Sequence, residues 1–386
     1  MNKQVLIIGA GKIGRGFVAQ LFYRSGYKLW FLDASREVVD RLNGEKKYRI
    51  DIAGEKRDTT EYISLEGAFT PGESEKIADT IDAVDIIVSS VGAANMESIA
   101  HCVKKALISR GRTRPLNWII CENANDPAKK IRDVLLREAG PDWEAYVRSG
   151  IGLIETQVLR TGMTASEDVL AREPLALRMQ DWWTLPLDGD AFIGPVPEVE
   201  GFRPRSHFSH ELLRKLYTFN GTNGPIAYVG WANGYRILHE SALAYPLFFR
   251  QIQEEAAHGL IREFGYDKAE QEAFATLAMK KYTDPALHDQ VERNAHDSRR
   301  KLGRDERLVG PALLCLKWGR EPLAYAKAIA AAYYYNGSTD AGTQEVLATV
   351  RKEGIENAVK KISSLDESSA LYHLVLEAYR AKGFIF

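Results

Sequence analysis

The stretch KLYTFNGTN, residues 215–223, places a lysine five residues before an asparagine. An amine that loses its proton near neutral pH can serve as a general base, and an amide can donate a hydrogen bond to an oxyanion. On an ideal helix, Lys215 lies about 20° from the edge of an apolar stripe about 80° wide. The stripe consists of Phe208, Leu212, Leu216 and Phe219. Burial beside it would lower the pKa of the lysine, although a border lysine more often extends its amine into water.

Two asparagines are candidates for holding a reacting oxygen. Asn220 follows Lys215 in the same segment, and Gly221 with Gly224-Pro225 predicts that the helix ends or bends there. Asn123, in NWIICENAND, directly follows an apolar strand, which places it at the crevice edge of a parallel sheet. Two amides could stabilise an alkoxide; either could equally be a turn residue or a helix cap.

Residues 5–16, VLIIGAGKIGRG, carry a dinucleotide-binding fingerprint between an apolar strand and a helical pattern. Gly9 permits a tight turn, Gly11 lets the backbone approach a pyrophosphate, and Gly14 allows close helix-to-strand packing. Ile13 lies beside them at the start of the helix, whose N-terminus favours an anion. The order of strand, glycines and helix is what makes this short motif specific.

The choice of dinucleotide depends on Asp33, which ends the strand LWFLD. Its carboxylate can accept hydrogen bonds from a ribose diol and would repel a 2′-phosphate, so the sequence predicts NAD rather than NADP. Arg36 could partly offset that repulsion. Ser90 and Gly92, in VSSVG, follow the next long apolar strand and are further candidates for the cofactor site, or an ordinary turn.

Composition and spacing limit the other possibilities. The formal net charge of −1 gives no basic field for nucleic acid. His207-x-x-His210-Glu211 lacks a third ligand at a recognisable spacing, so we expect a solvated helical turn and no metal. The three cysteines lie far apart and read as reduced thiols. Neither a signal peptide nor a membrane span is predicted, and we expect a cytoplasmic location.

Two kinds of segment divide the chain. Short apolar runs alternate with helices in the first half, which predicts a Rossmann-type, doubly wound parallel sheet in residues 1–200. Residues 175–201 are rich in Pro, Gly and Trp, and the predicted domain boundary lies there. Residues 201–386 should form a mainly helical substrate and catalytic domain. The fold class is therefore α/β followed by all-α.

Taken together, these motifs resemble the polyol-specific long-chain dehydrogenases. The resemblance rests on GAGKIGRGF, CEN, K-x4-N and the run VERNAHDSRRKLGRDERLVGPALL, and it covers essentially the whole chain. It implies a metal-independent, NAD-linked enzyme that interconverts a sugar alcohol or its phosphate with a ketose, with mannitol 1-phosphate and fructose 6-phosphate as the expected pair. By position, Lys215 would be the general base, Asn123 and Asn220 the oxyanion-stabilising pair, and Arg293 and Lys301 substrate-binding residues.

The chain departs from the family pattern at two positions. Asn223 stands where K-x4-N-x2-H has a histidine, and Leu159 stands where a V-D-R triplet has an aspartate. A site that hydrogen-bonds a hydroxyl can discriminate strongly, so these changes bear on substrate choice. A uronate, an unphosphorylated polyol and another sugar phosphate remain alternatives. A catalytically silent NAD-binding protein is a further one. Oligomeric state is left open.

Overall fold

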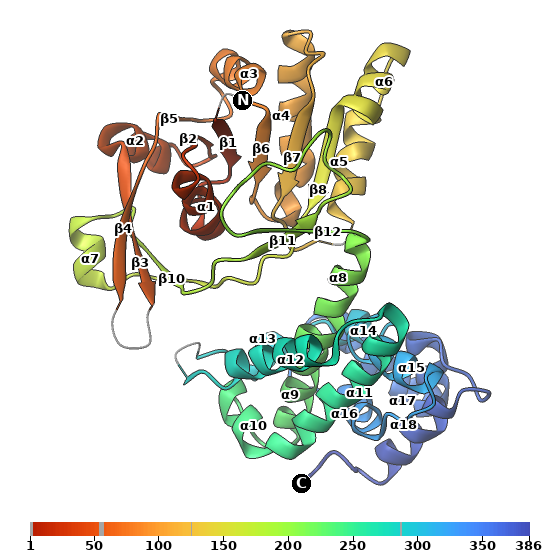
Figure 1. Ribbon diagram of the computed structural model, residues 1–386. Coiled ribbons are helices and arrows are strands. Elements are labelled where there is room, and N and C mark those ends of the chain that lie inside the picture. The colour runs from red at the N-terminus through yellow and green to blue at the C-terminus, as the bar shows by residue number, and fades with distance from the viewer. Residues whose placement is uncertain (1–2, 54–57, 125, 286–287) are drawn as a thin grey trace. The chain divides into compact units, whose positions relative to one another are not determined.

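Six parallel strands form the main sheet of the first part of the chain, in the order β5-β2-β1-β6-β7-β8 (Figure 1). The structure is a computed structural model and describes residues 3–53, 58–124, 126–285 and 288–386. The strands are β1 (Gln4–Ile8), β2 (Lys28–Leu32), β5 (Gly67–Phe69), β6 (Ile86–Ser89), β7 (Leu116–Ile120) and β8 (Ile151–Glu155). In chain order this is the 3-2-1-4-5-6 arrangement of dinucleotide-binding folds, as the sequence predicted.

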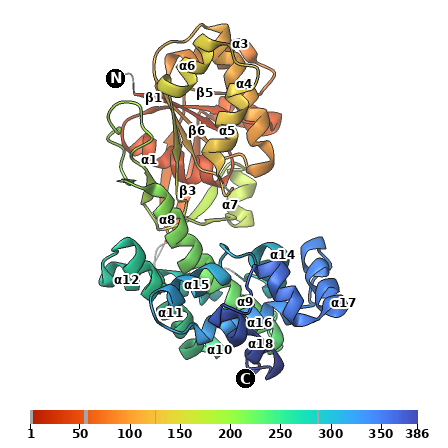
Figure 2. The ribbon, with the colours of Figure 1, turned by 90° about the vertical axis from the view of Figure 1, so that its right-hand side faces the viewer.

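Both faces of this sheet are buried, which explains why its strands are continuous apolar runs. Side chains of Leu6, Ile8 and Ile87 pack on one face against four helices. Figure 2 shows these helices gathered on one side of the strands. They are α3 (Ser74–Ala83), α4 (Met96–Ser109), α5 (Pro127–Leu136) and α6 (Pro141–Gly150). The 3-10 turn Ala93–Asn95 leads into α4.

The opposite face is covered by the first helix together with smaller sheets, so helices alone do not cover it. Val5, Ile7 and Val88 pack there against Phe17, Leu21 and strand residues from β3 and β10. The first helix consists of the π-helix η1 (Gly14–Val18) followed by α1 (Ala19–Arg24). The smaller sheets are β4-β3-β10-β9 and β11-β12. Their strands are β3 (Lys47–Ala53), β4 (Thr59–Ser64), β9 (Gly162–Met163), β10 (Leu177–Gln180), β11 (Leu185–Asp188) and β12 (Phe202–Arg205), and the remaining helices are α2 (Arg36–Glu45) and α7 (Glu167–Arg172).

Close contacts divide the chain into residues 1–208 and 209–386. The sequence had placed this boundary between residues 200 and 201, before β12. Because β12 pairs in parallel with β11, it belongs with the first unit. This long-range pairing could not be read from a Pro- and Gly-rich segment.

The described residues of the second unit form helices joined by loops, and α9, α11 and α16 pack together at its centre (Figure 1). Its first segment runs without interruption through α8 (Phe208–Lys215), the π-helix η3 (Leu216–Asn220) and α9 (Gly221–Ala232). The remaining helices are α10 (Leu238–Ala244), α11 (Pro246–Phe264), α12 (Lys268–Tyr282), α13 (Val291–Ala295), α14 (Ser298–Lys301), α15 (Val309–Lys317), α16 (Leu323–Tyr334), α17 (Ala341–Ser363) and α18 (Ala370–Arg380). Across the described residues of both units, every helix is too short or too polar to cross a membrane.

Candidate active site

The glycine fingerprint forms a tight turn between β1 and the first helix. Gly9 has a φ of 96°, in the left-handed region, and a Cβ there would meet the Ser90 carbonyl oxygen at 2.5 Å. A Cβ on Gly14 would collide with the Gly9 carbonyl, whereas one on Gly11 has no described atom within 4 Å. Ile13 opens the helix and packs on the core. The turn therefore leaves its backbone approachable at Gly11, the position assigned to the pyrophosphate.

Arg15 is a buried part of this turn that the sequence analysis did not single out. Its Nε donates to the Ala10 carbonyl at 2.5 Å, and its Nη1 donates to the Leu175 carbonyl at 2.5 Å. Burial lowers the pKa of its guanidinium, an effect that the neighbouring Tyr48 and Asp33 oppose. Arg15 thus ties the glycine turn to the chain before β10, a contact between residues distant in sequence.

Asp33 lies at the end of β2, where the prediction placed it. One carboxylate oxygen accepts the Ala10 N–H at 2.7 Å and the other accepts the Ser35 N–H at 2.8 Å. A carboxylate has further lone pairs, so it can also accept from a ribose diol. Arg36 is 64% exposed and donates to the Thr70 hydroxyl at 3.2 Å, with the Glu73 carboxylate 4.0 Å away. The Arg36 charge is therefore partly directed toward Glu73.

A glutamate missed by the sequence analysis holds the loop after β6. Glu122, inside the CEN motif, accepts the Val91 N–H at 2.7 Å and the Gly92 N–H at 2.8 Å with its two oxygens. Burial raises the pKa of this carboxyl, and the two backbone bonds act in the opposite direction. Ser90 donates its hydroxyl to the Gly9 carbonyl at 3.2 Å. The loop 90–92 is thereby joined both to the glycine turn and to the end of β7.

Asn123 directly follows Glu122 beyond the end of β7 and is exposed. The glycine turn, Asp33, loop 90–92 and Asn123 all follow the carboxyl ends of parallel strands, the edge where such sheets bind ligands. An approachable Gly11 backbone and a carboxylate at the end of β2 fit an NAD molecule. Gly9, Gly11, Ile13, Gly14, Asp33, Ser90 and Gly92 are the residues that would hold it.

Lys215 and Asn220 lie on a continuous helix that widens between them. Five residues apart on an α-helix, two side chains point about 140° away from each other. In η3 the backbone bonds run from residue i to i+5, and the Gly221 N–H accordingly reaches the Leu216 carbonyl. This geometry places residue i+5 one turn above residue i. The π-helix therefore brings Lys215 and Asn220 to the same side of the helix.

Local sequence signals describe this helix only in part. Of the two predicted outcomes at Gly221, an end of the helix is wrong, because α9 continues to Ala232 with Pro225 inside it. The uniform spacing used for the apolar stripe also fails beyond Lys215, since a π-helix adds residues to the turn. Leu212 and Leu216 are only partly buried, while Tyr217 and Phe219 are buried. Packing by neighbouring helices, and not local periodicity, decides the buried face.

The environment of Lys215 favours its neutral form. Burial, and secondarily the positive charge of Lys281, lower its pKa from 10.5 to about 8. Lys281, at the end of α12, has a lowered pKa itself, mainly through burial, with opposing contributions from Asp289 and Arg293. Of the two outcomes that the sequence left open for Lys215, this direction agrees with burial beside the apolar face and not with an amine that extends into water. An amine with this pKa is partly unprotonated near neutral pH and can accept a proton.

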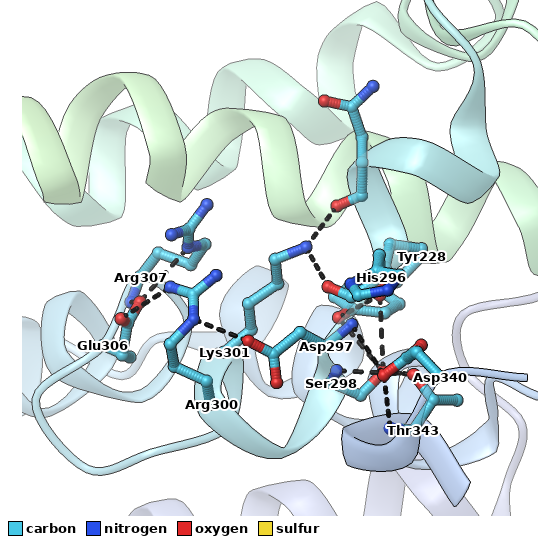
Figure 3. A network of polar contacts seen from close by, with 12 residues as sticks. Tyr228, His296, Asp297, Ser298, Arg300, Lys301, Glu306, Arg307, Asp340 and Thr343 are labelled. Carbon is cyan, nitrogen blue, oxygen red and sulfur yellow. Dashed lines mark hydrogen bonds and ion pairs between the residues drawn. The ribbon is translucent and has the colours of Figure 1, made fainter. Parts of the chain in front are cut away.

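Asn223 and Lys301 are joined through Asn294. Figure 3 shows the polar contacts around Lys301. The Asn223 amide donates to the Asn294 side-chain oxygen at 3.0 Å. Lys301 Nζ donates to the Asn294 carbonyl at 2.8 Å and to the His296 carbonyl. Lys301 is only 5% exposed, and burial, then the nearby Arg307 and Arg300, lower its pKa to about 7. Asn294, which the sequence analysis missed, joins Asn223 to Lys301.

Arg293 lies apart from this network. Its side chain is 78% exposed and pairs with Asp289 at 3.4 Å, one helical turn away. Other arginines of the basic run also have partners, since Arg300 pairs with Asp297 at 2.7 Å and Arg307 pairs with Glu306 at 3.2 Å. Arg300 and Arg307 of this run are therefore paired with carboxylates, and Lys301 and Arg307 are largely buried.

The triplet Val158-Leu159-Arg160 places its arginine in the interior. Arg160 donates to the Gln20 side chain at 2.7 Å and to the Gln180 carbonyl at 2.7 Å. Its guanidinium lies 4.6 Å from the Trp183 ring centroid, and burial lowers its pKa to about 10. Leu159 is partly buried. The arginine of this triplet therefore braces the first helix against β10.

Among the described residues, no group of three or more His, Cys, Asp or Glu side chains lies together in an arrangement that could hold a metal ion. A dinucleotide-binding parallel sheet in the first unit and a helical second unit define the class as a two-domain protein of the Rossmann type.

The comparisons with known proteins give the particular family. The chain belongs to the mannitol dehydrogenase family: its Rossmann-domain model matches residues 3–200 and its C-terminal-domain model matches residues 210–380. A relative is the mannitol-1-phosphate 5-dehydrogenase of Thermoanaerobacter pseudethanolicus, 29% identical over 378 residues that cover 96% of each chain. The predictions of family, fold class and enzyme class are thereby confirmed.

Two solved structures share the fold at low sequence identity. A D-sorbitol dehydrogenase in substrate-free form has a TM-score of 0.80 at 13% identity, covering 98% of this chain and 93% of its own. The Pseudomonas fluorescens mannitol 2-dehydrogenase, solved with NAD and D-mannitol, has a TM-score of 0.72 at 15% identity, covering 100% of this chain and 93% of its own.

Proposed function

We propose that the protein is an NAD-dependent, metal-independent polyol dehydrogenase that interconverts mannitol 1-phosphate and fructose 6-phosphate, with Lys215 as general base. The observation that carries the proposal is the partly buried Lys215 amine, whose pKa of about 8 suits proton transfer, on a π-helix that turns Asn220 to the same side. The family membership and the mannitol-1-phosphate 5-dehydrogenase relative support the reaction class.

Each proposed residue has a distinct chemical task. Lys215 takes the hydroxyl proton during oxidation and returns it during reduction of the ketose. Asn220 donates its amide to the substrate oxygen, and Asn123 is the proposed second donor. NAD, when bound, supplies the acceptor for the hydride that leaves the same carbon. Gly11, Asp33 and loop 90–92 would hold that cofactor.

Substrate recognition is proposed for the network of Asn223, Asn294 and Lys301. An amide pair offers both a donor and an acceptor to substrate hydroxyls, where the family pattern has a histidine. Lys301 is the proposed contact for an anionic group, and it lies near the positive charge of Arg307. The exposed Arg293 is the weaker of the two predicted contacts, because it already pairs with Asp289.

The test is the oxidation of NADH and NADPH with fructose 6-phosphate, fructose, uronates and other ketose phosphates. We expect fructose 6-phosphate with NADH to give the highest kcat/KM, and Lys215→Ala to lower kcat by about 10²–10⁴-fold. Lys268→Ala is the matched control, because this lysine is exposed at the start of α12. Equal activity of Lys215→Ala and wild type would contradict the mechanism. Preference for a uronate or for fructose would change the substrate, and no reduction at all would indicate a silent NAD-binding protein.

A further inference from the structure

The widened turn between Lys215 and Asn220 needs an explanation, because a π-helix is less favourable than the α-helix on either side. The first part of the explanation is Pro225. It has no N–H, so the Gly221 carbonyl, four residues earlier, lacks its helical donor. A buried carbonyl without a donor costs free energy, and Gly221 is buried. Another group must therefore satisfy this carbonyl.

Tyr325, on α16, donates to that carbonyl. Its hydroxyl lies 3.1 Å from the Gly221 oxygen and 3.3 Å from the Tyr217 oxygen, so one donor bridges the first residue of α9 and the π-helix. The side chain is fully buried. A Cβ on Gly221 would stand 2.7 Å from this hydroxyl, which shows that the tyrosine can approach only because residue 221 is glycine.

A second tyrosine reaches the same turn from another helix. Tyr282, at the end of α12, donates its hydroxyl to the Phe219 carbonyl at 3.1 Å. Lys281, whose charge contributes to the lowered pKa of Lys215, is its neighbour in sequence. The end of α12 therefore affects both the backbone of the turn and the environment of the lysine.

We propose that Tyr325 and Tyr282 are positioning residues that hold the π-helix, and thereby keep the Lys215 amine aligned with the Asn220 amide for catalysis. Neither tyrosine touches the reacting atoms in this scheme. Their hydroxyls satisfy carbonyls at Gly221, Tyr217 and Phe219 when the turn is wide. Without them, relaxation toward an α-helix would rotate Asn220 away from Lys215. The inference rests on the proposed roles of these two residues.

The experiment compares Tyr325→Phe and Tyr282→Phe with the matched control Tyr333→Phe. Tyr333 is also fully buried on α16, and its hydroxyl lies 2.7 Å from Ser363 Oγ, away from the turn. All three variants keep the ring and lose one buried hydroxyl donor, so similar losses of thermal stability are expected. Kinetics of ketose reduction and hydrogen exchange of residues 216–225 are measured for each.

We expect Tyr325→Phe and Tyr282→Phe to lower kcat by about 10- to 100-fold, because small misplacements of reacting groups have effects of this size. Their KM for NADH should stay at the wild-type value, the pH midpoint of kcat should move, and the segment 216–225 should exchange faster. Tyr333→Phe should change none of these. If the first two variants match the control in kcat, pH midpoint and exchange while Lys215→Ala is inactive, the positioning role is wrong and the catalytic lysine stands. If Lys215→Ala is itself as active as wild type, the proposed function is contradicted, and the positioning role that rests on it is contradicted as well.

Discussion

The pKa of Lys215 makes the pH dependence of the reaction a demanding test. A base must be neutral to accept the hydroxyl proton, so kcat/KM for polyol oxidation should rise with pH and level off above about 8. Ketose reduction needs the protonated amine and should fall above the same midpoint. With a pKa of about 8, roughly one lysine in eleven is neutral at pH 7; at the ordinary 10.5 the fraction would be about one in 3,000. Burial and the charge of Lys281 together thus raise the fraction of neutral Lys215 at pH 7 by roughly 300-fold.

Substitution of Lys281 tests this assignment. Its positive charge disfavours protonation of Lys215, so Lys281→Met should raise the pKa of Lys215 and move the midpoint of oxidation to a value between about 8 and 10.5. Activity at pH 7 should fall, while the plateau at high pH should change little, because the base itself is retained.

The assay follows initial rates of NADH formation from the polyol between pH 6 and 10.5 at constant ionic strength. Lys268→Met serves as the control, since this lysine lies on the same helix but pairs with Glu272 at the surface. A midpoint that stays in place or moves toward acid in Lys281→Met would refute the assignment of the titrating group to Lys215.

Four further variants test other parts of the site and the fold. Glu122→Gln places an amide NH2 group opposite one of the two backbone N–H groups that Glu122 accepts, so one hydrogen bond to the loop is lost. The variant should raise KM for NADH by about tenfold in steady-state kinetics while leaving the melting temperature nearly unchanged. Asp33→Ser should lower the ratio of kcat/KM for NADH over NADPH by about tenfold, because the group that repels a 2′-phosphate is gone; an unchanged ratio would argue against its ribose role. Asn294→Ala frees the Asn223 amide and should raise the ketose KM without affecting that for NADH. Glu255→Ala should lower the free energy of unfolding by about 2–4 kcal/mol in urea titrations, because Glu255 is fully buried and accepts the Ala324 and Tyr325 N–H groups at the start of α16.

The sequence by itself determined the features that depend on local order along the chain. The glycine turn and Asp33 at the end of β2 follow from one short motif and the strand after it, and the parallel sheet follows from the alternation of apolar runs with helices along the chain. The family resemblance followed from the order of such motifs. For Lys215 the sequence left two outcomes open, a buried amine with a lowered pKa or an amine that reaches water, and packing of the helices buries it.

Other features of the site depend on contacts between residues that are distant in sequence, and these are known only from the tertiary structure. Glu122 reaches the loop after β6, Arg15 reaches Leu175, and Asn294 joins Asn223 to Lys301. The widening of the helix between Lys215 and Asn220 was invisible in the spacing K-x4-N, which on an α-helix would separate the two side chains. Carbonyls in and beside that turn accept hydrogen bonds from tyrosines on two other helices. A local pattern cannot specify this, because the free energy that favours the wide turn comes from hydrogen bonds made only after the helices pack.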